Sequence, residues 1–325
     1  MKSIRTSRMA VVATFLTVAV FFFLPQESIG AYPERPITII VPYSPGGGLD
    51  LAARALADSM EKHLKQSVII VNKPGGATTI GGNTIVTAKP DGYMLGYFPT
   101  PTIIPEVYGY FYDAPYSSKD LKAICQVTLP CLTITVKEGT FPTLKELVEY
   151  VRKNPGAKMG THGKSGLAYI VMASIAKTES IKFTDVPFAG DSNIVPAILG
   201  DHITVGVPGY AAIKSLVEAK KLKPLALCLD RRVDFAPGVP AIVDLGYKLG
   251  VGSSHGFFGP KDLPDSIAKT INDVVQKIVA EKEFEQRIWN TSQIIDFLNT
   301  EMYRKRIQED KDILKTFFKE EGFVK

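Results

Sequence analysis

Three glycine-containing loops each follow a short apolar run and precede a stretch with helical periodicity. This recurrence constrains the fold more than any other feature of the chain. The runs are "ITIIVPYSPGGGLD" before "LAARALADSMEKHL", "SVIIVNKPGGATTIGG" before the segment Asn83 to Ala88, and "AKMGTHGKSG" before "LAYIVMASIAK". Apolar residues at helical spacing predict the helices, and short β-branched runs predict the strands. Alternating strands and helices are typical of an α/β fold with open, mostly parallel sheets.

The same rhythm extends over most of the remaining chain. Further strands are expected at "MLGYF", "FTDVPF", "ITVGV" and "LKPLALCL", and helices at "TLKELVEYVRKN", "IVPAILG" and "YAAIKSLVEAK". "HGFFGP" precedes three amphipathic C-terminal helices, which begin at Asp265, Lys282 and Glu301. After removal of a leader, roughly 295 residues are left, a length that favours two domains.

The N-terminus predicts export. Lys2, Arg5 and Arg8 precede an apolar run from Ala10 to Leu24, and small residues follow near Ala31. This order is that of a secretory signal peptide over residues 1–31. The alternative is an uncleaved anchor, although the run is shorter than the roughly 20 residues that a spanning helix needs. We expect a mature protein outside the cytoplasm, with no further membrane span.

Charge and cysteine content exclude several classes of protein. The formal net charge is +5, and the leader carries three basic side chains and one acidic one, so the mature chain is only mildly basic. No basic tract of the nucleic-acid-binding kind is present. Cys125 and Cys131 lie about 20 Å apart if both are on one strand, too far to bridge, although a turn at Pro130 would bring them together. We expect buried thiols, and the four scattered histidines form no metal-ligand set.

The loops in their order resemble one family of receptors. "PGGGLD", "NKPGG…IG" and "KPDGY", then "NPGAKMGTHGKSG", "VPFAGDSNIVPAILGDHITVGV" and "GFFGP", are similar to the solute-binding receptors of tripartite tricarboxylate transporters, also called Bug proteins. The resemblance covers essentially the whole mature chain. Any one of these motifs alone would be weak, whereas their combination is specific.

The resemblance implies a two-lobed, type II periplasmic-binding-protein fold that closes on a small ligand. It implies crossovers between the lobes near Cys131 to Val136 and near Gly252 to Phe258. Lobe one would then comprise residues 32–134 and 253–325, and lobe two residues 135–252. It also implies a periplasmic location, a small carboxylate ligand and integral-membrane transporter subunits as partners. We expect a monomer, with no cofactor, no metal and no nucleic acid.

The first glycine loop is the main candidate for holding a carboxylate. Helix N-termini present unpaired backbone N–H groups and a positive dipole end. Glycines admit the anion closely, and such loops lie where ligands bind in α/β sheets. We expect Ser44, Gly46, Gly47 and Gly48 to form half of a cradle, while Asp50 caps the following helix rather than contacting the ligand.

The loop "GTHGKSG" is expected to supply the other half of the site. Thr161, Gly163 and Ser165 offer hydroxyls or open amides, and His162 and Lys164 offer positive charge. The family form is closer to glycine-serine-serine-glycine, so this loop departs from the pattern. Lys164 either pairs with a second ligand carboxylate or extends into solvent.

Two other departures from the family pattern bear on the kind of acid. Phe188 and Ala189 stand where the family often has tyrosine and lysine. Val207, Pro208 and Gly209 occupy the region where many members carry an aspartate suited to a ligand amino group. Together with Tyr43 and Tyr210, they favour an organic acid with an apolar body and no cation, and aromatic acids are among the candidates, as are dicarboxylates if Lys164 faces the ligand. For each aromatic residue alone, ordinary core packing is the simpler interpretation.

The second glycine loop adds further candidates. Ala77 and Thr78 can donate an amide or a hydroxyl, as can Thr100 and Thr102 in "PTPTIIP". For threonines beside prolines, a purely structural role in a turn is nearly as good an explanation.

Three functions are compatible with the sequence. The first is a receptor, not an enzyme, that captures a carboxylate by hinge closure and delivers it to a transporter. The second is a ligand sensor for a signalling partner. The third is an exported α/β hydrolase, against which stands the absence of a G-x-S-x-G elbow, a phosphate loop or a dinucleotide-binding motif.

Overall fold

The computed structural model describes residues 32–109, 113–188, 190–247, 253–320 and 322 of the 325-residue chain. The chain divides into two compact units, Met1–Glu34 and Arg35–Lys325. Of the first unit only Tyr32 to Glu34 are described, and they form no helix or strand. The predicted signal peptide, residues 1–31, lies outside the described residues. The second unit contains two separate sheets.

The first sheet has six strands in the order β11-β4-β10-β3-β1-β2. β1 pairs in parallel with β2 and β3, whereas β10 and β11 pair in antiparallel fashion with their neighbours. The sheet is therefore mixed, not mostly parallel as the sequence predicted. The strands are β1 (Ile37–Val41), β2 (Val68–Asn72), β3 (Met94–Pro99), β4 (Leu121–Pro130), β10 (His255–Pro260) and β11 (Gln293–Leu298).

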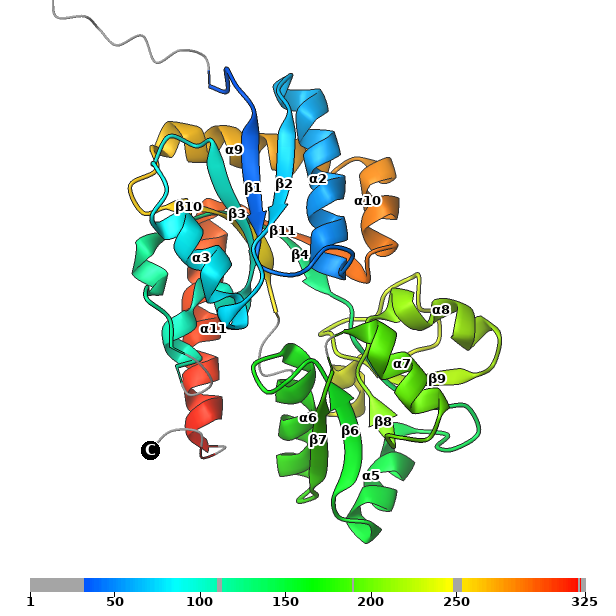
Figure 1. Ribbon diagram of the computed structural model, residues 1–325. Helices are drawn as coiled ribbons and strands as arrows, with labels where there is room; N and C mark the ends of the chain where they lie inside the picture. The colour runs from blue at the N-terminus through cyan, green and yellow to red at the C-terminus, as the bar shows by residue number, and fades with distance from the viewer. Residues whose placement is uncertain (1–31, 110–112, 189, 248–252, 321, 323–325) are drawn as a thin grey trace, which may run out of the picture. The chain divides into compact units, whose positions relative to one another are not determined.

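Helices cover both faces of the first sheet (Figure 1). Alternate strand residues point to opposite faces, so Ile40 belongs to the core that includes Ile85 of α3 and Leu314 of α11, while its neighbours are buried on the face next to α2. α10 lies beside α2. The helices are α2 (Gly48–Leu64), α3 (Thr79–Val86), α4 (Thr100–Ile103), α9 (Asp265–Ile278), α10 (Lys282–Trp289) and α11 (Thr300–Glu320), with short 3₁₀ turns η1 (Gly76–Thr78), η2 (Pro105–Val107) and η3 (Ser118–Asp120).

The second sheet has five strands in the order β7-β6-β8-β5-β9 and is also mixed. Its two faces pack on two separate cores. Val136 and Met172 belong to the core with α5 and α6, and Ile194 and Ile213 to the core with α7 and α8. The elements are β5 (Thr133–Lys137), α5 (Leu144–Lys153), β6 (Ala157–Thr161), α6 (Leu167–Thr178), β7 (Phe183–Pro187), α7 (Asp191–Leu199), β8 (Val205–Gly206), α8 (Tyr210–Glu218), β9 (Leu222–Leu227) and the 3₁₀ turn η4 (Ile242–Leu245).

One short connection joins the two sheets directly. β4 of the first sheet ends at Pro130, and β5 of the second sheet begins at Thr133. The predicted first crossover, Cys131 to Val136, overlaps this connection, although its residues from Thr133 onward already belong to β5. The return segment includes residues 248–252, which lie outside the described residues, so the exact lobe boundaries stay a prediction.

The three cysteines are free and buried, as predicted. Burial raises the pKa of each thiol, so all three are held in the unreactive protonated form. Among the helices of the described ranges, none combines the length and the apolar character that crossing a bilayer requires.

Candidate functional site

The loop between β1 and α2 uses its three glycines in different ways. Gly46 turns the chain with a φ of +87°, which favours glycine. Gly47 begins α2 in extended backbone, and no side chain caps it. Gly48 lies against the segment at Thr291, so close that a Cβ on Gly48 would come 2.6 Å from the carbonyl oxygen of Thr291. Tyr43 and Ser44 are exposed beside them.

Asp50 is not the helix cap that the sequence predicted. It lies in the first turn of α2, and its carboxylate reaches back to accept the Gly46 amide at 2.9 Å. Arg54 donates to both carboxylate oxygens at 3.0 Å, and Asn72 donates at 2.8 Å. Burial alone would raise the pKa of Asp50, but these hydrogen bonds outweigh it and lower the pKa. Asp50 thus holds the loop in place from beneath.

The amides of this loop are only partly available to a ligand. That of Gly46 is already bound to Asp50, so Gly46 cannot offer it in this conformation. Within the described residues, no acceptor takes the amides of Gly48 and Leu49 in the first turn of α2. A carboxylate above the helix would find these donors and the positive end of the helix dipole.

The second glycine loop is unusually strained. Four consecutive residues have positive φ, and two of them, Ala77 and Thr78, are not glycine. The buried hydroxyls of Thr78 and Thr102 have no hydrogen-bond partner among the residues that the structure describes. Unpaired buried hydroxyls are costly, so a water or a ligand oxygen is the natural partner for each.

Thr100 has a different role from the one expected. Its hydroxyl accepts the Ser254 amide at 2.8 Å and lies 3.2 Å from the Ser254 hydroxyl. Thr100 is 3% exposed. In this conformation it ties the end of β3 to the start of β10, and its hydroxyl is not directed to an open site.

The loop between β6 and α6 contains the second set of candidates. The Thr161 hydroxyl donates to Asp185 at 2.6 Å and accepts the Gly163 amide at 3.0 Å, so both groups are engaged within the protein. His162 Nε2 lies 2.9 Å from Asp191 Oδ1. The amides of Leu167 and Ala168 have no acceptor among the described residues. The open donors of this loop are therefore those at the start of α6, next to Ser165.

Lys164 does not pair with any described side chain. It lines a groove of about 580 Å³ between α6 and β7, together with Tyr169, Met172 and Phe183. The Lys164 side chain is exposed, so burial does not hold its ammonium group in this groove.

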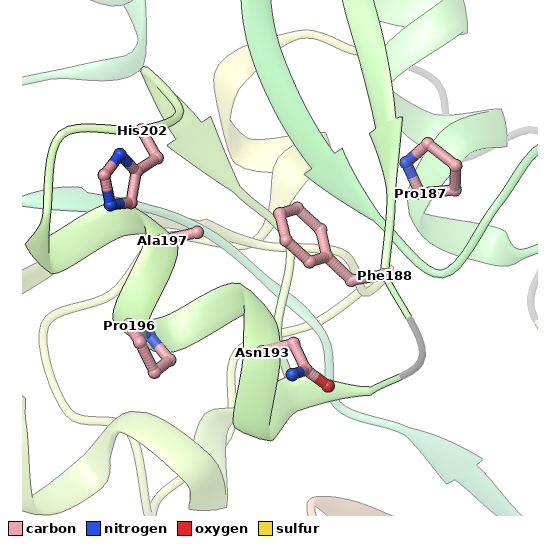
Figure 2. A pocket seen from close by; sticks show the side chains of 6 residues that line it. All are labelled: Pro187, Phe188, Asn193, Pro196, Ala197 and His202. Atoms are coloured by element: carbon pink, nitrogen blue, oxygen red, sulfur yellow. The ribbon is translucent and has the colours of Figure 1, made fainter.

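The side chain of Phe188 packs beside α7 and does not extend into the loop that follows β7 (Figure 2). It lines a pocket of about 490 Å³ whose other residues are Pro187, Asn193, Pro196, Ala197 and His202. Figure 2 shows its ring turned toward Ala197 and His202. Ala189, which follows it, lies outside the described residues. Pro208 is buried, and its carbonyl accepts the Thr133 amide at 2.9 Å.

Four helices have glycine at the N-cap position. These are Gly47 before α2, Gly166 before α6, Gly190 before α7 and Gly209 before α8, and none of these residues has a side chain that could accept a helix amide. By contrast, α5 begins at Thr143, whose hydroxyl accepts the Glu146 amide. Glycine starts leave room for an anion at the helix end, whereas a threonine cap satisfies the amide itself.

Comparison with known proteins identifies the family. The sequence profile described as "Tripartite tricarboxylate transporter family receptor" (TctC) matches residues 52–323. The chain belongs to this receptor family. This finding confirms the resemblance drawn from the loops.

Relatives of the receptor family share both its sequence and its fold. A UPF0065 protein of Cupriavidus necator is 26% identical over 309 residues, which cover 92% of this chain and 91% of that protein. The structure of a TctC solute-binding protein from Polaromonas, without ligand, is 26% identical, with a TM-score of 0.74 over 89% of this chain and 99% of that one. The periplasmic binding protein BugD is 25% identical, with a TM-score of 0.74 over 90% and 99%. The predicted two-lobed periplasmic-binding-protein fold is thus confirmed.

Three residues of this TctC-family receptor contact the candidate loops or the start of α8 but were not predicted from the sequence. Asp191 binds His162, Gln293 donates to the Gly48 carbonyl at 2.6 Å, and Ser292 accepts the Ala211 amide at 2.9 Å. For Asp191, the only local signal was its position directly after Gly190 and shortly before a predicted helix. For Ser292 and Gln293 there was none, because the partners are remote in the sequence.

No metal site accompanies these loops. Across the part of the chain that the structure describes, no group of three or more histidine, cysteine, aspartate or glutamate side chains converges in a way that would hold an ion. What the geometry offers a ligand is hydrogen-bond donors and helix dipoles.

Proposed function

We propose that this receptor captures a small carboxylate outside the cytoplasm and delivers it to the membrane subunits of a tripartite transporter. The acid would bind between the loop that follows β1 and the loop that follows β6, and the lobes would close over it. Several predicted contacts are already bonded within the protein, namely the Gly46 and Gly163 amides and the Thr100 and Thr161 hydroxyls. The proposed donors are therefore the amides at the two helix starts, those of Gly48 and Leu49 and those of Leu167 and Ala168.

The observation that carries the proposal is the pair of helix starts at Gly47 and Gly166. Each follows a strand, lacks a side-chain cap and leaves two amides without a protein acceptor among the described residues. An anion placed between the two helix starts can accept hydrogen bonds from the amides of both helices at once. Closure is then favoured by the ligand because only the closed state uses both sets of donors.

The surrounding residues support an acid without a positive charge. Pro208 and Gly209 stand where an aspartate would bind an ammonium group, and the Gly209 amide is taken by Asp191 at 3.1 Å. Dicarboxylates are the class that we favour, because Lys164 is free to approach a second carboxylate. MatC of Rhodopseudomonas palustris, which shares the fold at 20% identity, is a structure with bound malate.

The test is a binding screen on the chain from residue 32 onward. Thermal shift and then calorimetry would be run with succinate, malate, adipate, citrate, benzoate and glutamate. We expect one or more of the acids to raise the melting temperature and to be recovered unchanged. The methyl esters of the same acids are the matched control, and they should not bind, because they lack the anionic oxygens.

Two results would contradict the proposal. If no carboxylate binds, or if the esters bind as well as the acids, the helix starts are not an anion site. If a bound compound is recovered as a hydrolysed product, the exported hydrolase becomes the better explanation. A transporter role would be supported by loss of uptake of the same acid in cells that lack the receptor.

A further inference from the structure

We infer that Thr291, Ser292 and Gln293 form a brace that positions the two proposed ligand loops relative to each other. This 291–293 brace lies between α10 and β11, and it is proposed to act on the ligand only through the loops that it contacts. The inference rests on the proposed function for what the loops bind, but not for the contacts themselves.

One end of the brace holds the loop before α2. Gln293 Nε2 donates to the Gly48 carbonyl at 2.6 Å, and the Thr291 carbonyl lies so close that Gly48 has no room for a Cβ. Gln293 Oε1 is in turn fixed by the Thr128 hydroxyl and by His255 Nδ1 at 2.8 Å. Gln293 is 1% exposed. A buried amide with all these partners has one orientation available to it.

The other end of the brace holds the second sheet. The Ser292 carbonyl accepts the amide of Cys131, in the connection between β4 and β5, at 2.7 Å. Its hydroxyl accepts the Ala211 amide at the start of α8 at 2.9 Å. Ser292 has a φ of +60°, uncommon for a non-glycine residue, and this turn presents both oxygens to the second sheet. The start of α8 is thereby capped from another part of the chain and is closed to an anion.

Polar contacts continue from the brace to the second ligand loop. The Gly209 amide, beside the Ser292 hydroxyl, donates to Asp191 Oδ2 at 3.1 Å. Asp191 Oδ1 lies 2.9 Å from His162 Nε2. An unbroken series of contacts therefore runs from Gly48 to His162. Neither end of it can shift freely while the intermediate bonds remain intact, so the brace sets the relative geometry of the two loops.

The experiment cuts one end of the brace and measures the other. Ser292→Gly keeps the backbone turn and the carbonyl but removes the hydroxyl from Ala211. Gln293→Met keeps the volume but removes the donor to Gly48. Hydrogen exchange of each ligand-free protein would be followed by mass spectrometry. We expect about five-fold faster exchange in peptide 43–51 of Ser292→Gly, and likewise in peptide 160–168 of Gln293→Met, as for the loss of one hydrogen bond.

The matched control is Thr143→Ala, which removes a comparable cap from α5. This helix packs on the second sheet, away from the two ligand loops. Thr143→Ala should speed exchange at the start of α5 alone. If each brace variant speeds exchange only at its own end, the brace does not couple the loops and the inference is wrong. Should Gln293→Met fail to fold, Ser292→Gly decides the matter. Because no ligand is present, this result is independent of which acid binds.

Discussion

At the scale of single residues, Gly47 separates ligand binding from folding. A Cβ at this position would meet only the Ser44 carbonyl, 4.0 Å away, and the backbone is extended, with φ −79° and ψ 164°. Gly47→Val should therefore fold with a loss of stability below about 1 kcal/mol. Its branched side chain would block the approach of an anion to the start of α2, and we expect about 2 kcal/mol weaker binding, or roughly thirty-fold in Kd. Calorimetry with Gly47→Ala as an intermediate checks this, and wild-type affinity in Gly47→Val would exclude the loop.

Lys164 tests whether the ligand carries a second carboxylate. Lys164→Ala should weaken dicarboxylates by up to about 1 kcal/mol, which is the range for an exposed ion pair, and leave monocarboxylates nearly unchanged. Lys182→Ala is the matched control, since Lys182 lines the same groove. Titrating both variants with succinate, adipate and benzoate makes the comparison. Equal losses for the two classes of acid would remove Lys164 from the site.

At the scale of elements, the start of α2 depends on a residue that does not touch the ligand. Asp50→Asn removes the charge that Arg54 and the Gly46 amide bind, and we expect about 2 kcal/mol lower stability in urea unfolding, together with weaker ligand binding. The pKa of Asp50 is lowered by folding, so its contribution is full above the ordinary carboxyl pKa and is lost as the pH falls through the folded value.

Asp58→Asn provides the control on the same helix. Asp58 is exposed and pairs with Arg287 at 2.6 Å, so its loss should change stability by less than about 0.5 kcal/mol. If the two variants are equally stable, the carboxylate of Asp50 does not hold the loop in the way that the hydrogen bonds indicate.

The elements were largely predictable from sequence, whereas their pairing was not. The apolar run of β1, the helical spacing of α2 and the glycines that follow β1 and β6 are local signals, and each predicted its element. α3 begins at Thr79 rather than Asn83, and β8 is only Val205–Gly206, because element ends depend on tertiary contacts. No strand was predicted at β4, β5, β10 or β11. β11, for example, is six residues between two helices and carries little periodicity.

The site was predicted in the same uneven way. Glycine loops after strands indicated where an anion binds, because the reason is local backbone geometry. The residues that hold these loops come from elsewhere: Gln293 reaches Gly48 across 245 positions in the sequence. Thr161, Thr100 and Gly46 were expected to face the ligand, but their polar groups are bonded within the protein. No pattern in a single sequence distinguishes a free hydroxyl from one with a remote partner.

At the scale of the whole molecule, His255 makes stability depend on pH. It is 6% exposed in the first sheet, and burial lowers its pKa from 6.5 to about 4, although the hydrogen bond with Gln293 acts in the opposite direction. Between pH 6.5 and about 4, His255 is protonated in the unfolded chain but stays neutral in the folded protein. His255 therefore costs no stability above its unfolded pKa, and stability falls progressively as the pH drops toward 4.

The contribution of Asp310 to stability changes with pH in the opposite direction from that of His255. In the wild type alone it would mask the effect of His255. Burial raises the pKa of Asp310 to about 6, so stability falls as the pH rises from its unfolded pKa of 3.8 through that value. The comparison must therefore be between the wild type and His255→Gln, both of which contain Asp310. Urea unfolding followed by the emission of Trp289, the chain's single tryptophan, provides the free energies.

The expected result is that the difference in the free energy of unfolding between the wild type and His255→Gln changes with pH. His255→Gln should be less stable at pH 7.5, because it disturbs the bond with Gln293. At pH 4.5 the difference in the free energy of unfolding between the two proteins should narrow by about 2.5 kcal/mol, because only the wild type is destabilised by keeping a histidine neutral at that pH. A constant difference from pH 7.5 to 4.5 would mean that His255 titrates in the folded protein as it does in the unfolded chain. The polar contacts around Gln293 would then be open to water, and the rigidity that we assign to the 291–293 brace would have no basis.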